Sequence, residues 1–510
     1  MQVTGDSQLS SNGANVAAAI QNVSNCVNVL NSLNVFNSLS RQKEPFVPLE
    51  AGSVKMYVCG VTVYDYCHLG HARTYVTWDT VRRYLEWKGY RVTYVQNFTD
   101  VDDKILKRAR EQGSSMQAVS EQFIEAYRKD MERLNVKTAD AYPRATTSLE
   151  AMYRLIRDLE LKQFAYRVRG QEGGEDVYYA VGKFDGYGKL SGRKLADMQA
   201  GASGRVGAEG AEKRDPSDFA LWKSAPHSEE GFESPWGWGR PGWHIECSAM
   251  VRQNLGDRID IHAGGADLKF PHHENEIAQS EPVAGEPFAK YWMHNGFLNI
   301  DGEKMSKSLG NFTTIRDLLK TYDPMALRLF FLQTQYRSPI DLTDESLTAA
   351  TNAWKTLSAA LQFARSLALQ GVEPEGEAIA SFETAMDDDF SSPGGLAVAF
   401  DLAKTLNKEQ NQRIHTGAGV LPEAVCQAKA KALLEIADVL GLAIADSPVE
   451  TVTEVPNDLS EADIQALLER RNAARREKNF SAADEIRARL EAEGITILDR
   501  ADGTSHWVRS

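Results

Sequence analysis

The chain has 510 residues, of which 42% are hydrophobic and 25% charged, a composition ordinary for a soluble globular protein and a length typical of about three domains. No run of about 18 consecutive apolar residues occurs, which excludes a transmembrane helix, so no membrane partner is expected. Five cysteines do not make a disulfide framework, and the odd count favours a reducing compartment or a metal site. Because the first 40 residues contain no Lys or Arg, a secretory or mitochondrial leader is not expected, and we expect a cytoplasmic location.

The net charge of −14 is concentrated in one segment. Residues 341–460 hold 19 acidic and 7 basic side chains, whereas residues 41–340 hold 41 of each. The neutral part can therefore face a polyanion through local basic patches, although the whole chain is acidic.

A strand–helix–strand pattern follows residues 1–33, which are rich in Asn, Ser, Val and Ala and predict a disordered extension. Residues 54–58 predict a strand, residues 69–88 a helix and residues 91–98 a second strand. This unit predicts the α/β class with a Rossmann-like parallel sheet, whose ligands bind beyond the carboxyl ends of the strands. Cys59 and the loop after it are therefore expected in the site.

Later segments have other patterns. Residues 100–110 predict a helix with acids in its first turn, and residues 115–225 predict an insertion with a Gly-rich hairpin. Residues 341–446 are acidic, rich in Ala and Leu and helical in period, which predicts a bundle. A proline-containing linker, 447–457, separates the bundle from a helical C-terminal segment that carries arginines.

The first chemical motif is Cys67-His68-Leu69-Gly70-His71, at the start of the first predicted helix. A glycine between two histidines lets a ligand approach the backbone, and a helix N-terminus attracts phosphate. His68 and His71 could donate to phosphate oxygens as charge builds in a transition state. The alternative is a pair of satisfied histidines beside a turn, because a four-residue pattern has limited specificity.

The second motif is Lys304-Met305-Ser306-Lys307-Ser308. Two lysines flanked by small hydroxyl residues suit a mobile clamp on a triphosphate, and a solvated basic loop is the alternative. All five residues in this order, about 235 positions after the histidine motif, favour the phosphate role.

Together the two motifs are the signatures of the class I aminoacyl-tRNA synthetases. Three further runs, Tyr57–Asp65, Pro241–Met250 and Phe270–Glu276, resemble the cysteinyl-tRNA synthetase family. The resemblance extends from about Asn34 to Ser510 and is weakest in the predicted bundle. The resemblance implies a Rossmann-like catalytic domain in two halves, 34–114 and 226–340, separated by a connective insertion, 115–225. It also implies a DALR-like helical bundle, 341–446, and a small anticodon-binding domain, 458–510.

A metal site is the third feature. Cys59, Cys247, His272 and Glu276 offer two thiols, an imidazole and a carboxylate, with the last two at i and i+4 on one predicted helix face. From the residues alone, buried cysteines without a metal are a competing reading, and His273 competes with His272. The resemblance implies one Zn²⁺ on the first four, because these positions match the family's zinc ligands. Zinc binds a thiolate directly and a serine hydroxyl poorly, so it would select cysteine where shape could not.

The resemblance also implies the substrate pockets. Gly264-Gly265-Ala266-Asp267 follows a predicted strand, where the acid can accept from a ribose hydroxyl, although an ordinary glycine turn is the alternative. The implied ATP-binding residues are His68, Gly70, His71, Gly265, Asp267 and Lys307. The implied cysteine-binding residues are Gly60, Thr99, Trp243 and His262. The implied catalytic residues are His68, His71, Lys304 and Lys307.

The C-terminal segment carries several arginines on one helical side, and Trp507 offers a stacking surface for an unpaired base. A solvated charged face is the common alternative, and acidic residues interleave with the arginines. Because the family reads the anticodon with this end, the resemblance implies tRNA contacts by Arg471, Arg475 and Trp507.

The expected activity is that of a cysteine–tRNA ligase: L-cysteine and Mg-ATP give cysteinyl-adenylate, and the cysteine then passes to the 3′ end of tRNA(Cys). The expected partners are L-cysteine, ATP and tRNA(Cys), the expected cofactors are Zn²⁺ and Mg²⁺, and the family suggests a monomer. The alternatives are the related cysteine:glucosaminyl-inositol ligase of mycothiol synthesis, a catalytically inactive RNA-binding paralogue, and a structural zinc protein with an incidental nucleotide site. The intact motifs and the C-terminal region favour the first reading.

Overall fold

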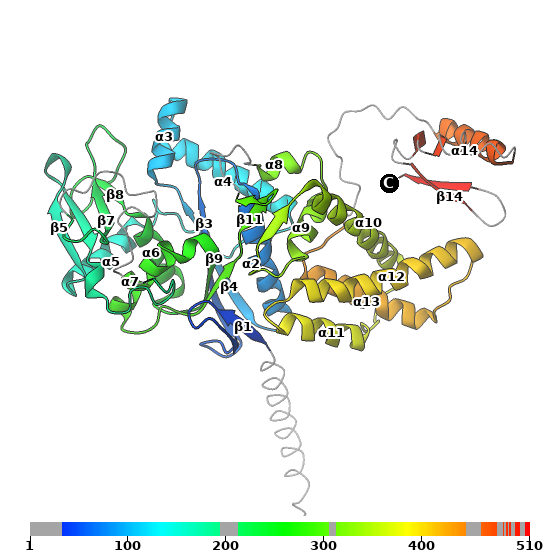
Figure 1. The fold of residues 1–510 in the computed structure, drawn as a ribbon, viewed down its shortest axis with the longest axis horizontal. Coiled ribbons are helices and arrows are strands. Elements are labelled where there is room, and N and C mark those ends of the chain that lie inside the picture. The colour runs from blue at the N-terminus through cyan, green and yellow to red at the C-terminus, as the bar shows by residue number, and fades with distance from the viewer. Residues whose placement is uncertain are drawn as a thin grey trace, which may run out of the picture. The chain divides into compact units, whose positions relative to one another are not determined.

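The computed structural model describes residues 33–193, 213–304, 313–444, 461–476, 483, 486–487, 489–490, 495–499 and 505–509. Residues 1–32 of the expected extension and the expected linker 447–457 lie outside these ranges. The chain forms two compact units (Figure 1). Unit 1 consists of the described parts of Met1–Lys355, Ile379–Val398 and Ile436–Ala443, and unit 2 of those of Thr356–Ala378, Ala399–Glu435 and Ile444–Ser510.

A four-stranded parallel sheet forms the framework of unit 1, which confirms the expected α/β fold (Figure 1). Its strands are β3 (Ser53–Thr62), β4 (Arg91–Thr99), β9 (Ile259–Gly265) and β10 (Ala289–Asn295), in the order β10-β9-β3-β4. Most of their side chains are buried on both faces, as in parallel sheets covered by helices. Strand β3 has β4 as its neighbour on one side and β9 on the other, so the strand order changes direction at β3. In parallel sheets, ligands bind at such a topological switch point, beyond the carboxyl ends of the strands.

The helices that follow β3 and β4 can be compared with the helix boundaries expected from local sequence signals. Helix α2 (Leu69–Trp87) lies within one residue of its expected bounds. Helix α3 (Asp103–Gln112) begins three residues later than expected, so the predicted start at Asp100 is wrong. Asp102 is extended and its side chain accepts a hydrogen bond from the backbone N of Lys104 at 2.8 Å, which makes it the N-cap.

The segment expected to be an insertion contains two helices and an antiparallel sheet. The elements are α4 (Met116–Arg133), α5 (Leu149–Leu161), β5 (Ala165–Arg169), β6 (Glu175–Tyr179), β7 (Phe219–Ser224) and β8 (Gly239–Pro241), with the strands in that order. Strand β8 lies beyond residue 225, so this sheet reaches past the expected end of the insertion. Helices α6 (Trp243–Leu255) and α7 (His272–Ala284) then pack on each other beside the central sheet.

Smaller elements complete unit 1. They are the hairpin of β1 (Asn34–Asn37) and β2 (Gln42–Pro45), the sheet of β11 (Leu298–Ile300), β12 (Glu303–Lys304) and β13 (Ile340–Leu342), and the helices α8 (Ile315–Leu318) and α9 (Pro324–Leu332). Helix α9 begins with Pro324 at its first position, and the side chain of Asp323 caps it by accepting from the backbone N of Met325.

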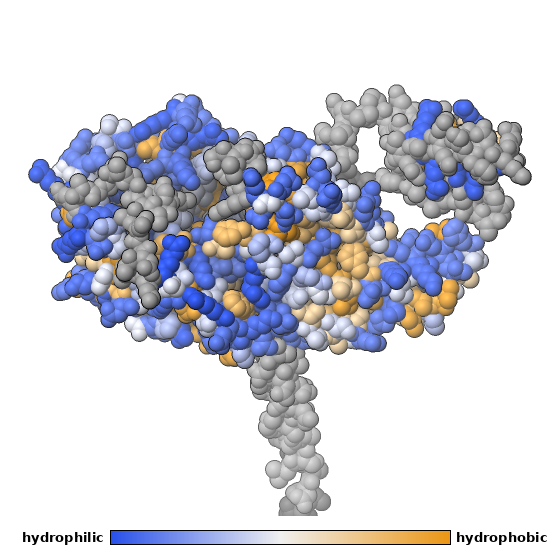
Figure 2. Space-filling model, viewed as in Figure 1, coloured by the Kyte–Doolittle hydropathy of each residue, from blue (hydrophilic) through white to orange (hydrophobic). Residues whose placement is uncertain are grey.

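Long helices follow, as expected for this region. They are α10 (Asp344–Ser366), α11 (Gly376–Asp387), α12 (Ser392–Thr416) and α13 (Glu423–Val439). The C-terminal part contains α14 (Glu461–Arg476) and an antiparallel pair, β14 (Ile495–Asp499) with β15 (Ser505–Arg509). None of the helices in the described ranges is long and apolar enough to cross a membrane. Hydrophilic residues cover most of the face in Figure 2, with smaller hydrophobic patches between them.

Candidate active site

A cavity of about 410 Å³ opens at the carboxyl ends of the central strands, where most of the predicted site residues meet. The predicted residues that line it are Cys59, Gly60, His68, Gly70, His71, Thr99, Trp243, Cys247, Gly265, Asp267 and His272. Two others, His262 and Glu276, are fully buried and contact this set. The backbone of Lys304 lies in β12, whereas Lys307 lies outside the described residues.

The histidine motif lies at the N-terminus of α2. His68 is the extended N-cap residue, its carbonyl accepts from His71 N at 2.9 Å, and the two imidazole rings stack with centroids 3.7 Å apart. The first turn of this helix contains no acid, so the positive end of the helix dipole is not neutralised locally. Gly70 lines the cavity in that turn, which leaves the backbone open to a phosphate.

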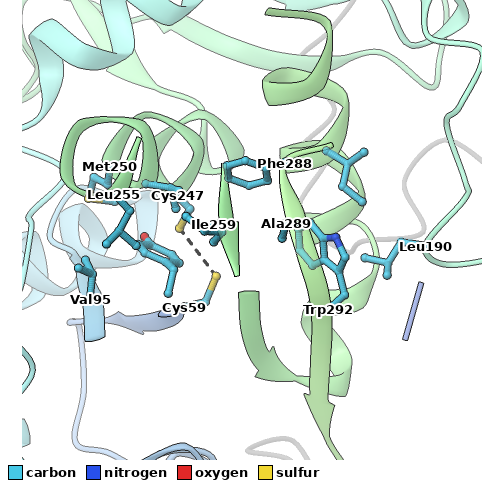
Figure 3. Close-up of a cluster of buried hydrophobic side chains, with 13 residues drawn as sticks. Cys59, Val95, Leu190, Cys247, Met250, Leu255, Ile259, Phe288, Ala289 and Trp292 are labelled. Atoms are coloured by element: carbon cyan, nitrogen blue, oxygen red, sulfur yellow. Dashed lines mark hydrogen bonds between the residues drawn. The ribbon is translucent and has the colours of Figure 1, made fainter. Parts of the chain in front are cut away.

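The four predicted zinc ligands come together from three elements. Cys59 is in β3, Cys247 is in α6, and His272 and Glu276 occupy one face at the start of α7. The Sγ atom of Cys59 lies 4.0 Å from that of Cys247 and 3.7 Å from Glu276 Oε1, and His272 Nε2 lies 3.1 Å from Glu276 Oε1. The four ligand atoms lie within 4.8 Å of one another. Figure 3 shows the two sulfur atoms facing each other within a cluster of buried hydrophobic side chains.

The chemistry of this donor set fits zinc. Two sulfurs, one imidazole and one carboxylate are donors that Zn²⁺ takes in proteins, and all four residues are buried here. Burial raises the pKa of the Cys59 thiol and of the Glu276 carboxyl well above their ordinary values. A divalent metal would oppose this effect by favouring the ionised forms of both groups.

A second donor set overlaps the first. Cys59 and Glu276 also lie within 4.8 Å of the ligand atoms of His262 and His273. His273 Nε2 is 3.3 Å from Cys59 Sγ, and His262 Nε2 is 3.0 Å from Glu276 Oε2. The competition between His272 and His273 anticipated from the sequence is therefore present in the geometry. Burial lowers the pKa of His262 to about 3, so this imidazole is neutral at physiological pH.

Sequence reasoning missed the residues behind these groups. His273 Nδ1 lies 2.9 Å from His294 Nε2, and His294 Nδ1 lies 2.8 Å from Ser38 Oγ. The hydroxyl of Thr99 donates to Glu246 Oε2 at 3.0 Å. His294 could have been found, because it stands at the carboxyl end of an apolar strand, as Cys59 does. The roles of Ser38 and Glu246 had no sequence signal, since each depends on a distant partner.

The part of the cavity beside the thiols is narrow. Gly60 N donates to Asn97 Oδ1 at 2.8 Å, and a Cβ atom on Gly60 would lie 1.6 Å from the Asn97 carbonyl oxygen. Only glycine therefore fits at this position. The ring of Trp243 stacks on that of His272, with centroids 4.2 Å apart and planes 22° apart. The backbone of Gly60 and the ring of Trp243 both line the cavity beside the thiols.

Gly265 and Asp267 line the same cavity and suit a nucleotide. Gly265 ends β9, and Asp267 lies in the short 3-10 helix η4 (Ala266–Lys269) that follows. A Cβ atom on Gly265 would lie 2.5 Å from Asp267 Oδ1, so the glycine lets this carboxylate fold back over the strand end. A carboxylate can accept from a ribose hydroxyl, while the nearby N-terminus of α2 can take a phosphate.

The predicted tRNA contacts lie in the C-terminal part. Arg471 in α14 is only 3% exposed, whereas Arg475 on the same helix is exposed. The guanidinium of Arg471 is therefore enclosed by the protein. The backbone of Trp507 lies in β15, opposite Ile497 of β14.

Three family models match the chain. The one described as "tRNA synthetases class I (C) catalytic domain" matches residues 45–352, more than half of the chain. The "DALR domain" matches residues 381–445, and the "Cysteinyl-tRNA ligase anticodon binding domain" matches residues 457–507.

Similar proteins extend these matches over nearly the whole chain. A cysteine–tRNA ligase of Synechococcus sp. (strain JA-3-3Ab) is 60% identical over 499 residues, covering 92% of this chain and 98% of that protein. Another, of Gloeothece citriformis (strain PCC 7424), is 55% identical over 486 residues, covering 93% and 99%. A solved methionyl-tRNA synthetase of Mycobacterium tuberculosis, bound by methionyl-adenylate, shares the fold with a TM-score of 0.54 at 15% identity, covering 76% of this chain and 90% of that chain. The family models and the high identity to full-length relatives show that the chain belongs to the cysteine–tRNA ligase family of class I tRNA synthetases.

Proposed function

We propose that this protein activates L-cysteine with ATP and transfers it to tRNA(Cys). The observation that carries the proposal is one cavity lined by two chemically different groups of residues. The first group is Cys59, Cys247 and His272, with the buried Glu276 beside them, and the second is the N-terminus of α2 with its two histidines. A small thiol substrate and a nucleotide would meet between them. The relatives named cysteine–tRNA ligase support the same activity.

In the first step the carboxylate of cysteine attacks the α-phosphorus of ATP. The new bond joins a carboxylate oxygen to that phosphorus, and pyrophosphate leaves with the electron pair of the broken bond. His68 and His71 would donate to the phosphate oxygens, and Lys304 and Lys307 would add positive charge. Because no proton has to move when the carboxylate attacks the phosphorus, positioning and electrostatics supply most of the rate. ATP would enter as its Mg²⁺ complex, which would add positive charge to the phosphates.

Selection of cysteine would depend on the thiols and the walls around them. Cys59, Cys247, His272 and Glu276 would hold one Zn²⁺, which binds a substrate thiolate far better than a serine hydroxyl. Gly60, Thr99, Trp243 and His262 would surround the bound cysteine, with Gly60 allowing β3 to lie against Asn97 of the next strand. The adenosine would lie against Gly265 and Asp267, next to Gly70.

In the second step the terminal ribose hydroxyl of the tRNA attacks the carbonyl carbon of cysteinyl-adenylate, and AMP leaves. We propose that residues 458–510 bind the anticodon, with the exposed Arg475 contacting a phosphate. Trp507 would stack on a base. Arg471 would support this surface from within. We place the protein in the cytoplasm as a monomer, with the domain boundaries that its sequence predicts, except that the inserted region extends to β8.

The test is transfer of labelled cysteine to tRNA bearing a cysteine anticodon, with ATP present and serine as competitor. Charging that is unaffected by a large excess of serine supports both the reaction and selection of the thiol. Cysteine-dependent ATP–pyrophosphate exchange without charging would instead favour a cysteine ligase for a small molecule, such as glucosaminyl-inositol. Absence of both reactions in a folded, zinc-loaded preparation would favour an inactive RNA-binding paralogue.

A further inference from the structure

Arg73 is buried in helix α2, two residues after His71, with only 1% of its surface exposed. Its guanidinium donates three hydrogen bonds, all to backbone carbonyl groups. Nη1 donates to Phe297 O at 2.5 Å, and Nη2 donates to Tyr336 O at 3.2 Å and to Ser338 O. One side chain of the helix that carries the histidine motif therefore holds two separate segments of backbone.

These two segments cross in direct contact. Gly296 N donates to Tyr336 O at 2.8 Å, and Ile340 N donates to Phe297 O at 3.0 Å. A Cβ atom on Gly296 would lie 2.5 Å from Ser338 O, so the backbones approach too closely for a side chain between them. Phe297 O and Tyr336 O each accept one backbone N–H in this crossing. The guanidinium of Arg73 gives each of these two carbonyl groups a second donor and also donates to Ser338 O, so it ties both segments to α2.

The charge of Arg73 is not compensated by a carboxylate in the part of the chain that the structure describes. Burial lowers the pKa of Arg73 to about 10, which leaves the guanidinium protonated at neutral pH. The wall of the cavity therefore contains a positive charge whose partners are carbonyl dipoles. A positive charge in this wall favours an anionic ligand.

Arg73 and the segment that it holds line the same cavity. Residues 295–298 form one stretch of the lining, and Gly70, His71 and Arg73 belong to the helix beside it. Strand β11 continues from this stretch and pairs with β12, where Asn299 is opposite Lys304. Strand pairing holds the two ends of residues 295–298, and Arg73 adds a direct link from this stretch to the helix of the histidine motif.

Resting on the ligase function proposed above, we propose that Arg73 is a positioning residue for ATP. It fixes the spacing between the N-terminus of α2 and residues 295–298, and its charge adds to that of the helix N-terminus. Cysteine would bind beside Cys59 and Cys247, on walls that Arg73 does not hold. Loss of Arg73 should therefore weaken the binding of ATP and leave the binding of cysteine unchanged.

The test compares Arg73→Met and Arg73→Lys with the wild type in ATP–pyrophosphate exchange. We expect the KM for ATP to rise about 10-fold or more in both variants, while the KM for cysteine stays within about twofold of wild type. A rise of this size in the KM for ATP corresponds to the loss of a charge-assisted interaction of about 1.5–3 kcal/mol. Lysine keeps the charge but cannot reach three carbonyl groups in fixed directions, so it should share the defect. Wild-type kinetics in Arg73→Lys would overturn the positioning role.

Arg83→Met is the matched control on the same helix. Arg83 is also buried and donates to a backbone carbonyl, Asn135 O at 2.8 Å, but it does not line the cavity. The variant Arg83→Met should lower the temperature of unfolding without changing the KM for ATP or the KM for cysteine. If Arg83→Met raises the KM for ATP as much as Arg73→Met does, general loosening explains the effect and the proposal fails. Titration calorimetry with a non-hydrolysable ATP analogue gives a second readout, which remains valid even if the wild type shows no exchange with cysteine.

Discussion

Asp79, near the middle of α2, accepts hydrogen bonds from two buried arginines. Its Oδ2 atom lies 2.5 Å from Arg328 Nη2 and 2.8 Å from Arg83 Nε, and its Oδ1 accepts from the backbone N of Lys137 at 2.8 Å. Arg328 lies in α9 and also donates to Leu440 O at 2.8 Å. This cluster joins the helix of the histidine motif to α9 and to the end of α13 within unit 1.

Asp79→Asn keeps the shape of the side chain and removes its charge. Arg328 is 0% exposed and Arg83 is 7% exposed, so the substitution leaves two guanidinium groups without their buried counter-ion. Breaking a buried pair in this way costs about 3–5 kcal/mol of unfolding free energy. At roughly 2 °C per kcal/mol for a large unit, unfolding should begin ~6–10 °C lower. The assay is calorimetry together with urea denaturation followed by circular dichroism.

The pH dependence of this effect has a definite sign. Burial alone would raise the pKa of Asp79, but Arg328 and Arg83 outweigh it and hold the pKa below its ordinary value. The ionised carboxylate therefore contributes stability above the unfolded pKa of about 3.9, and this contribution is lost as the pH falls through the folded pKa. The difference in unfolding free energy between wild type and Asp79→Asn should narrow below about pH 4.

A matched control is Asp388→Asn, whose partner Lys43 forms an exposed ion pair, with side chains 66% and 40% exposed. Such a pair contributes about 0–1 kcal/mol, so this variant should resemble the wild type. A loss below about 1 kcal/mol in Asp79→Asn, or a difference that stays constant down to pH 3, would refute the reasoning about the buried cluster.

Four further substitutions test the cavity itself. Cys247→Ser should lose zinc, measured by metal analysis after dialysis against a chelator, while Cys67→Ser should keep it, because Cys67 is buried outside both donor sets. Retention of zinc by Cys247→Ser would contradict the proposed ligand set. His273→Gln should also keep zinc. Loss of zinc from this variant would instead assign the metal to the second donor set. Gly60→Ala would place a Cβ atom 1.6 Å from the Asn97 carbonyl oxygen, so cysteine activation should fall about 100-fold or more, and near-normal exchange would argue against this wall.

Local signals in the sequence determined the elements that carry the site. The β-branched runs before Cys59 and before Thr99 predict two parallel strands, and the spacing between them predicts the helix of the histidine motif. The i, i+4 relation of His272 and Glu276 needs only the periodicity of one helix. Local reasoning erred at the start of α3, because several acids compete for the N-cap and tertiary contacts choose among them.

Only the tertiary structure decided which distant groups meet. Cys59 and Cys247 are 188 positions apart in sequence and have their sulfurs 4.0 Å apart, because the order of the central strands places β3 beside β9 and under α6. Arg73 looks like an ordinary helical arginine until the fold brings three backbone carbonyl groups to it across more than 200 residues. Side-chain patterns record periodicity and local capping, whereas these contacts depend on strand order and on how closely two backbones cross, which sequence spacing does not encode.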